Sequence, residues 1–358
     1  MTKKILALGL LAGVALTAVS VATWAADKAP TTAHDHAAML AQQAGMDLKD
    51  MKEMYKRPAD IPFPKDNAYS DAKYDLGKQL FFDPRLSRSK VMSCATCHNP
   101  SFSWGDGLAK GVGDKHNPLG RRTPTAMNLA WDTLFFWDGR AASLEEQALG
   151  PIASPGEMNM PHETMIADLK QIAPYHDAFA KAFPGEADPV TKENVAKAIA
   201  TFERKIVSGK APFDKWIEGD DKAISESAQR GFVIFNTKGQ CATCHSGWNF
   251  GNSAMFHDLG LKDDDIGRAK IVTDDPNMQH AFKTVGLRNI AERGPYMHDG
   301  SLPTLEAVVD HYNNGFEKRE TVILQELNLT DEEKKDLVEF MKSLTSVDDP
   351  VTLPILPR

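Results

Sequence analysis

All four cysteines of the 358-residue chain lie in two copies of one pentapeptide, Cys-Ala-Thr-Cys-His. The residues concerned are Cys94, Cys97 and His98 in the first copy, and Cys241, Cys244 and His245 in the second. Two thiols at this spacing can form thioether bonds with the two vinyl groups of one haem. The histidine can then ligate the iron, because positions i, i+3 and i+4 share one face of a helical turn. The motifs therefore predict two covalently bound c-type haems, with His98 and His245 as iron ligands.

Paired cysteines also serve other chemistries. An even number of cysteines in an exported chain is typical of disulfides, and two Cys-x-x-Cys pairs suit a zinc site or a thioredoxin-like redox centre. The histidine that directly follows each pair favours haem attachment over these alternatives, and no cysteine is left over for them.

The N-terminus has the layout of a secretory signal peptide. Lys3 and Lys4 precede an apolar run over residues 5–21, and small residues follow at Thr23 and Ala25. We expect residues 1–25 to be removed and the mature protein to reside in the periplasm. A membrane anchor is the alternative, but the run is short and no other stretch is apolar for long enough to span a bilayer. We therefore expect no membrane anchor after cleavage.

The mature chain is long enough for about two domains, each with its own core. Its net charge of −8 comes without a basic tract, so neither a nucleic acid nor an anionic membrane is an implied partner. Residues 26–54 look like a polar, flexible lead-in in which His34 and His36 are solvated.

Helical periodicity dominates the rest of the chain. It is seen in Val195, Ile199, Phe202 and Ile206, and in Leu337, Phe340, Met341 and Leu344 behind a Thr330/Glu333 capping box. Similar apolar segments, residues 77–81 and 231–235, precede the two motifs and indicate a duplicated module. We predict a mainly α fold of two cytochrome c-like helical domains with long loops, each holding one c-type haem. The first spans residues 55–211, and the second spans residues 212–358 with a C-terminal tail that packs back onto the body.

Further motifs resemble the bacterial di-haem cytochrome c peroxidase and MauG superfamily. They comprise residues 136–140, 147, 150–151, 157–159, 287–289 and 294–300, in the order of that family. The resemblance runs from about Tyr55 to Leu344. It implies that hydrogen peroxide reacts at the haem of the first motif, and that the haem of the second motif relays or stores oxidising equivalents.

The resemblance also implies roles for four other side chains. Trp137 stands where the family has a tryptophan between the haems, although core packing alone would also explain it. Glu157 corresponds to the distal-pocket glutamate, with Gln147 and Pro151 lining the same pocket. A carboxylate placed there could move a proton between the two peroxide oxygens, whereas a surface position is the ordinary alternative for a glutamate.

The sequence departs from the family's usual peroxidases at the second haem. Tyr312 stands where they have a methionine that ligates the iron, and MauG-like members have a tyrosine there. A phenolate is an established haem ligand and favours ferric iron. Tyr312 is also the last member of an apolar helix face with Leu305, Val308 and Val309, and both roles are compatible. His311 and Met297 are the rival ligands.

Two further departures concern the first domain. Asp114 stands where peroxidases that need reductive activation have a distal histidine, and His116 is displaced from that place by two residues. We expect His116 to be a solvated loop residue and the first iron to be open. Arg122 stands where an asparagine usually helps to bind a calcium ion between the domains, which argues against a calcium ion that the family would otherwise imply.

Together these features predict a periplasmic di-haem oxidoreductase of the MauG-like branch. Its partners would be hydrogen peroxide and either a small redox protein, a cytochrome c or a cupredoxin, or a protein substrate. The first alternative is a standard cytochrome c peroxidase that takes electrons from such a small redox protein. The second is a non-catalytic di-haem electron carrier, which would have no use for Glu157.

Overall fold

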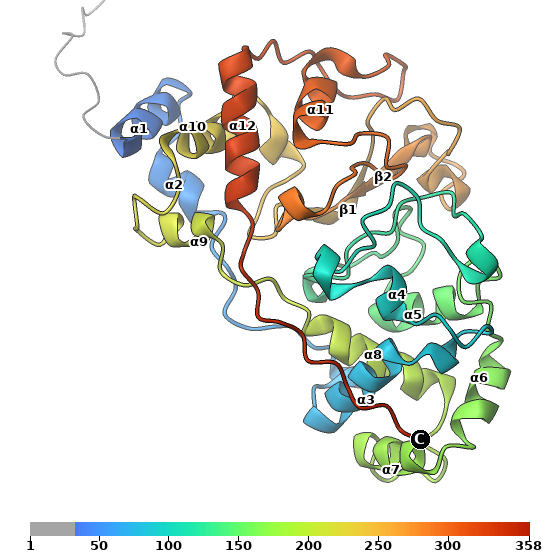
Figure 1. Ribbon diagram of the computed structural model, residues 1–358. Coiled ribbons are helices and arrows are strands. Elements are labelled where there is room, and N and C mark those ends of the chain that lie inside the picture. Colours follow the sequence, from blue (N-terminus) through green and yellow to red (C-terminus); the bar gives the residue numbers. More distant parts are fainter. Residues whose placement is uncertain (1–32) are drawn as a thin grey trace, which may run out of the picture.

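The computed structural model describes residues 33–358 (Figure 1), so the expected signal peptide, residues 1–25, lies outside the described residues. The helices are α1 (Ala33–Gln43), α2 (Leu48–Glu53), α3 (Asp71–Phe82), α4 (Cys94–Cys97), α5 (Leu144–Ala153), α6 (His162–Leu169), α7 (Ala173–Ala182), α8 (Lys192–Arg204), α9 (Pro212–Ile217), α10 (Glu226–Asn236), α11 (Leu305–Asp310) and α12 (Asp331–Ser343). Two short strands, β1 (Asn252–Asp258) and β2 (Ala281–Thr284), pair antiparallel. The prediction of a mainly α fold with long loops is confirmed. Within residues 33–358, no helix is long and apolar enough to cross a bilayer.

The first lobe is built on the crossing of α3 and α8. Ser70 begins α3 by accepting a hydrogen bond from the Lys73 amide, 3.2 Å away. The two helices meet at Gly77, where a Cβ atom would lie only 1.9 Å from the Ala198 carbonyl oxygen. A glycine is therefore required for this close approach, which buries the apolar face of α8 predicted from the sequence.

The second lobe repeats this arrangement with α10 and α12. A Cβ atom at Gly231 would lie 2.0 Å from the Asp336 carbonyl oxygen, so a glycine again permits the crossing. The predicted capping box is present, since Thr330 and Glu333 bond to each other's backbone amides. The apolar segments before the two motifs thus belong to the same module, used twice.

Each end of the chain packs on the lobe farther from it in sequence. Helices α1 and α2 lie against α10 and α9 of the second lobe (Figure 1), and Ala37, Ala41 and Met51 are fully buried there. The C-terminal tail runs the other way, and Val351 packs against the core of the first lobe. Where the structure describes it, the expected flexible lead-in at residues 26–54 is therefore helical and packed, because α1 and α2 each present an apolar face. His34 and His36 lie outside the part whose side chains are described.

The expected domain boundaries, residues 55–211 and 212–358, do not account for the two chain ends. Each end packs on the lobe that is formed mainly by the other half of the chain. Tyr55, at the start of the first range, lies in the core of the second lobe. The tail from Thr345 onward returns to the first lobe, and Asp348 accepts a hydrogen bond of 2.6 Å from the Gly209 amide. Each lobe is thus completed by a segment from the far end of the chain.

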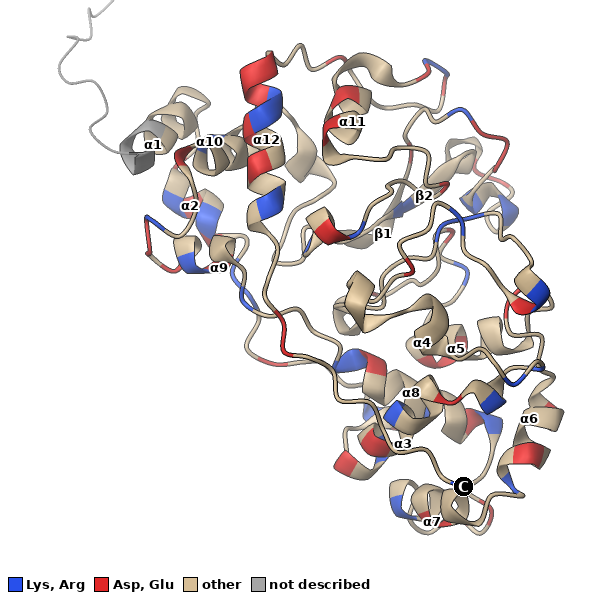
Figure 2. Ribbon diagram, in the orientation of Figure 1, with Lys and Arg blue, Asp and Glu red and all other residues tan. Residues whose placement is uncertain are grey.

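Charged residues of both signs are interspersed along the peripheral helices, whereas α4 has none (Figure 2). Helix α12 begins with Asp331, Glu332 and Glu333 and has Lys342 in its last turn, which matches the charges to the helix dipole. The helix that carries the first motif is free of charge, as suits contact with an apolar cofactor.

Replacing Tyr55 tests whether the N-terminal segment stabilises the second lobe. The Tyr55 ring is fully buried, stacks on Phe250 with centroids 4.5 Å apart, and its hydroxyl donates a 2.6 Å hydrogen bond to Asn236. Tyr55→Ala should lower the free energy of unfolding of the holoprotein by about 3–5 kcal/mol, the usual cost of removing a buried aromatic ring. Urea unfolding measures this change. Tyr69→Ala, at an exposed tyrosine, is the matched control and should cost less than about 1 kcal/mol. Equal losses in the two variants would contradict the packing described.

Candidate haem and peroxide site

A cavity of about 690 Å³ lies between the two lobes. Every site residue expected from the sequence lines it: Cys94, Cys97, His98, Trp137, Gln147, Pro151, Glu157, Cys241, Cys244, His245 and Tyr312. Its volume is within the range of about 300–1,000 Å³ that is usual for small-molecule and cofactor sites. The fold therefore brings together side chains that are up to 218 residues apart in the sequence, from Cys94 to Tyr312.

The first motif forms one short helical turn, α4. The His98 amide donates a 2.8 Å hydrogen bond to the Cys94 carbonyl, which places thiol and imidazole on one face as expected. His98 Nδ1 lies 3.2 Å from the Trp104 carbonyl oxygen. Because a carbonyl can only accept, Nδ1 carries the hydrogen and Nε2 keeps the lone pair that an iron ligand needs.

The second motif repeats this geometry. The His245 amide donates to the Cys241 carbonyl at 2.8 Å, and His245 Nδ1 lies 2.7 Å from the Phe250 carbonyl oxygen. Burial lowers the pKa of His98 and lowers that of His245 to about 4, so both rings are neutral. A neutral imidazole of fixed tautomer is the form that ligates a metal.

The four thiols are not built for thiol–disulfide redox chemistry. Burial raises the pKa of Cys97 to about 11 and that of Cys241 to about 12, and it raises the pKa of Cys94 and Cys244 as well. Redox-active thiols instead have a lowered pKa. The donor set therefore fits covalent haem attachment better than the alternatives weighed from the sequence.

The loop after α5 brings Glu157 to the cavity. Pro151, inside α5, accepts a 3.0 Å hydrogen bond at its carbonyl from the Met158 amide, and the Glu157 amide donates to Ser154 at 3.0 Å. These bonds fold the loop back onto the helix that also carries Gln147. The Glu157 side chain is half-buried, in electrostatic range of Cys97.

Asp114 and His116 do not line this cavity. Asp114 is buried, its amide donates a 2.7 Å hydrogen bond to the Glu157 carbonyl, and its carboxylate accepts one of 3.2 Å from Asn159. It thus holds the loop that carries Glu157. His116 is exposed, in agreement with the expectation of a solvated loop residue.

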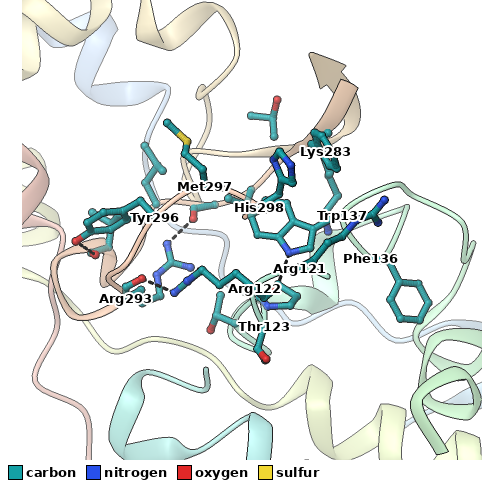
Figure 3. Close-up of a pocket in the computed structure, with 18 of the residues that line it drawn as sticks. Arg121, Arg122, Thr123, Phe136, Trp137, Lys283, Arg293, Tyr296, Met297 and His298 are labelled. Carbon is teal, nitrogen blue, oxygen red and sulfur yellow. Dashed lines mark hydrogen bonds between the residues drawn. The ribbon is translucent and has the colours of Figure 1, made fainter. Parts of the chain in front are cut away.

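Trp137 lies where the two lobes meet (Figure 3). Its indole nitrogen donates a 2.8 Å hydrogen bond to the Arg122 carbonyl, and its own carbonyl accepts one of 2.8 Å from the Lys283 amide of β2. The ring stands edge-on to His298, with centroids 6.3 Å apart. Only 8% of Trp137 is exposed, so it is both a core residue and part of the cavity wall.

Tyr312 lies in a π-helical turn (His311–Gly315) that continues α11. The apolar face predicted from the sequence lines the cavity as a whole, since Leu305, Val308 and Val309 lie on its wall with Tyr312. Burial is the largest of the effects that raise the pKa of Tyr312. A phenolate at this position would therefore need a neighbouring cation such as ferric iron.

The two rival ligands differ in their placement. His311 Nε2 lies 2.7 Å from the Leu259 carbonyl oxygen, and His311 is absent from the cavity wall. Met297 does line the cavity. Of the two, only Met297 is placed to compete with Tyr312.

Sequence reasoning missed Glu203, His257 and Arg293 on the cavity wall. Glu203 is 5% exposed, its Oε2 atom has no hydrogen-bond partner, and burial raises its pKa to about 8. It follows Phe202 in the predicted helix, and periodicity gives no sign that an acid would be buried there. Arg293 lies just outside the motif at residues 294–300, so no sequence feature indicated that its side chain would be buried.

Comparison with known proteins extends these observations. The family model for the di-haem cytochrome c peroxidase matches residues 71–222. The methylamine utilization protein MauG of Methylorubrum extorquens is 47% identical over 333 residues, which cover 92% of this chain and 94% of that protein. Cytochrome c551 peroxidase of Pseudomonas aeruginosa is 37% identical, covering 80% and 83%. A crystal structure of a MauG-like protein associated with microbial copper homeostasis superposes with a TM-score of 0.73 at 30% identity, covering 82% of this chain and 95% of that one.

The match to the family model includes the first motif, and the match to MauG extends over nearly the whole chain. The resemblance stated from the motifs is thus confirmed, and haem c is the cofactor of this family. The chain belongs to the di-haem cytochrome c peroxidase family and is an oxidoreductase of the di-haem peroxidase type.

Proposed function

We propose that this chain is a periplasmic di-haem oxidoreductase in which hydrogen peroxide reacts at the haem of the first motif and the second haem relays or stores oxidising equivalents. The observation that carries the proposal is the shared cavity, whose wall holds both motifs, Glu157 and Tyr312. Two haems, each covalently bound through two thioether bonds, would occupy it, with His98 and His245 as iron ligands. An electron carrier would not need a carboxylate in this wall.

When bound, the first haem would supply the redox chemistry of peroxide cleavage. The protein supplies the proton transfer. Glu157 takes the proton from one peroxide oxygen and returns it to the other, which becomes water. Gln147 and Pro151 shape the same part of the cavity, and the hydrogen bonds around Asp114 fix the loop on which Glu157 stands.

The tyrosine at position 312 supports the MauG-like assignment over the standard peroxidase. A phenolate ligand stabilises ferric iron, so the second haem would hold an oxidising equivalent rather than accept electrons readily. The 47% identity to MauG, against 37% to cytochrome c551 peroxidase, points the same way. Trp137, at the lobe junction, would mediate transfer between the two haems.

The partners follow from these two readings. A MauG-like enzyme would oxidise a protein substrate, whereas a standard peroxidase would take electrons from a small cytochrome c or a cupredoxin. Met297 also lines the cavity, so a methionine is available as the iron ligand that the standard peroxidase would need. Cleavage of residues 1–25 would release the protein into the periplasm without an anchor.

Haem attachment is tested by replacing both thiols of one motif at a time. The double variants Cys94→Ala/Cys97→Ala and Cys241→Ala/Cys244→Ala should each retain about one haem fewer than the wild type after acid-acetone extraction, because thioether bonds survive denaturation whereas axial ligation does not. Pyridine haemochrome assays count the retained haem. Wild-type protein should retain two, and extraction of all haem from it would remove the basis of the proposal.

The proton-transfer role is tested by Glu157→Gln, which keeps the shape of the side chain and removes its basic oxygen. Peroxide turnover should fall by about 10²–10⁴-fold while both haem spectra persist. Stopped-flow absorption measures the rate. Glu163→Gln changes an exposed glutamate of α6 and should leave the rate unchanged. Unaltered kinetics in Glu157→Gln would show the carboxylate to be structural.

The ligand of the second iron decides between the two readings. With Tyr312 as ligand, the untreated ferric protein should show one high-spin and one low-spin haem and react with peroxide without prior reduction. Tyr312→Met should raise the potential of the second haem, because a neutral thioether stabilises ferric iron less than a phenolate. Electron paramagnetic resonance and redox titration measure both. A wild type that is inert until reduced would instead favour Met297 and the standard peroxidase.

A further inference from the structure

Two buried arginines, Arg122 and Arg293, lie side by side where the lobes meet (Figure 3). Arg122 comes from the first lobe and donates through Nη2 to the Arg293 carbonyl of the second. Arg293 donates through Nη2 to the Gly286 carbonyl at 2.5 Å. They are 9% and 6% exposed, and both line the cavity.

Among residues 33–358, neither guanidinium has a carboxylate partner, and the Nε atoms of both are buried without any hydrogen-bond partner. The neighbouring Arg121 is different, because it pairs with Asp138 at 2.7 Å and Asp265 at 2.6 Å. Asp106, an acid in electrostatic range of Arg122, accepts hydrogen bonds from the Thr123 hydroxyl and the Leu108 amide instead. Burial and the charge of Arg122 lower the pKa of Arg293 to about 9.

Such a pair requires an anion, since two like charges out of water are costly unless compensated. Apart from Glu157, to which the proposed function gives the proton transfer, the carboxylates of the cavity wall do not supply it. Asp132 pairs with Lys283 and Asp265 pairs with Arg121, while Glu203 has a raised pKa that favours its neutral form. Each haem carries two propionate carboxylates, and a guanidinium fork is well suited to bind a carboxylate.

We propose that Arg122 and Arg293 form a built-in dicationic site that binds haem propionates from the cavity and takes the place of a divalent cation between the lobes. This inference rests on the proposed binding of two haems in the cavity. Arg122, which by the family resemblance stands where an asparagine usually helps to bind calcium, would supply one of the two positive charges.

The surroundings disfavour a metal ion at this site. Carbonyl oxygens could coordinate calcium, but those of Arg122, Arg293 and Gly286 already accept hydrogen bonds from Trp137, Arg122 and Arg293. The two guanidinium groups also repel a cation. Within residues 33–358, no group of three or more His, Cys, Asp or Glu side chains is arranged to hold a metal.

The site should raise the reduction potential of the haem it touches. Ferric haem carries one more positive charge than ferrous haem, so a nearby fixed cation favours the ferrous state. Removing one guanidinium should therefore lower the potential. Arg293 is in electrostatic range of His245, which makes the second haem the more sensitive one.

The test is a redox titration of the holoprotein with Arg122→Gln and Arg293→Gln. Each should shift the ferric/ferrous equilibrium of at least one haem by about tenfold towards ferric, or about 59 mV. Arg122→Lys keeps a charge and should retain most of the wild-type potential, which separates charge from packing. Lys181→Gln, an exposed residue of α7, removes the same charge far from the cavity and should cause no shift.

Calcium dependence is measured in the same samples. Treatment of the wild type with EDTA, or addition of calcium, should change neither the potentials nor the melting temperature. A change on chelation, or unaltered potentials in both Gln variants that still hold two haems, would overturn the inference. Haem counts keep this result distinct from failure of the proposed function, in which the wild type itself would lack two bound haems.

Discussion

The cavity lies where the two lobes meet, and backbone hydrogen bonds join the lobes along its wall. The Arg122 amide of the first lobe donates a 2.7 Å hydrogen bond to the His298 carbonyl of the second, and the Lys283 amide returns one of 2.8 Å to Trp137. Each contact uses the main chain of a residue on the cavity wall. Such bonds are individually worth about 1 kcal/mol, but leaving these buried groups unpaired would cost more. The same residues therefore join the two lobes and line the candidate site.

The exchanged chain ends reinforce this junction from outside. Tyr55 ties the N-terminal helices to the second lobe, whereas Asp348 and Val351 tie the C-terminal tail to the first. For the two lobes to move apart, the N-terminal helices would have to leave the second lobe or the C-terminal tail would have to leave the first. This connection suits an enzyme in which two redox centres must keep a fixed separation.

The sequence predicted the features that depend on short-range rules. The motifs, the apolar faces of α8 and α12, and the Thr330 capping box all follow from spacing along one helix or turn. It did not predict the packing of α1 and α2, because short apolar faces such as Ala37 and Ala41 give a weak periodic signal. Nor did it reveal the burial of Glu203 and Arg293, since burial of a charge depends on what the rest of the chain places beside it.

The residues around the two motifs differ in a way that fits a division of labour between the haems. On the side of Cys94 and Cys97, the wall contains Gln147, Glu157 and Glu203, all groups able to bond or move a proton. On the side of Cys241 and Cys244, Tyr312 stands in an apolar face formed by Leu305, Val308 and Val309. Peroxide cleavage needs proton transfer, whereas holding an oxidising equivalent needs a stable ligand and the absence of reactive neighbours. Under the proposed function, the two copies of the module would serve different tasks, because the cavity wall places different side chains beside each motif while the Cys-Ala-Thr-Cys-His motif is the same in both.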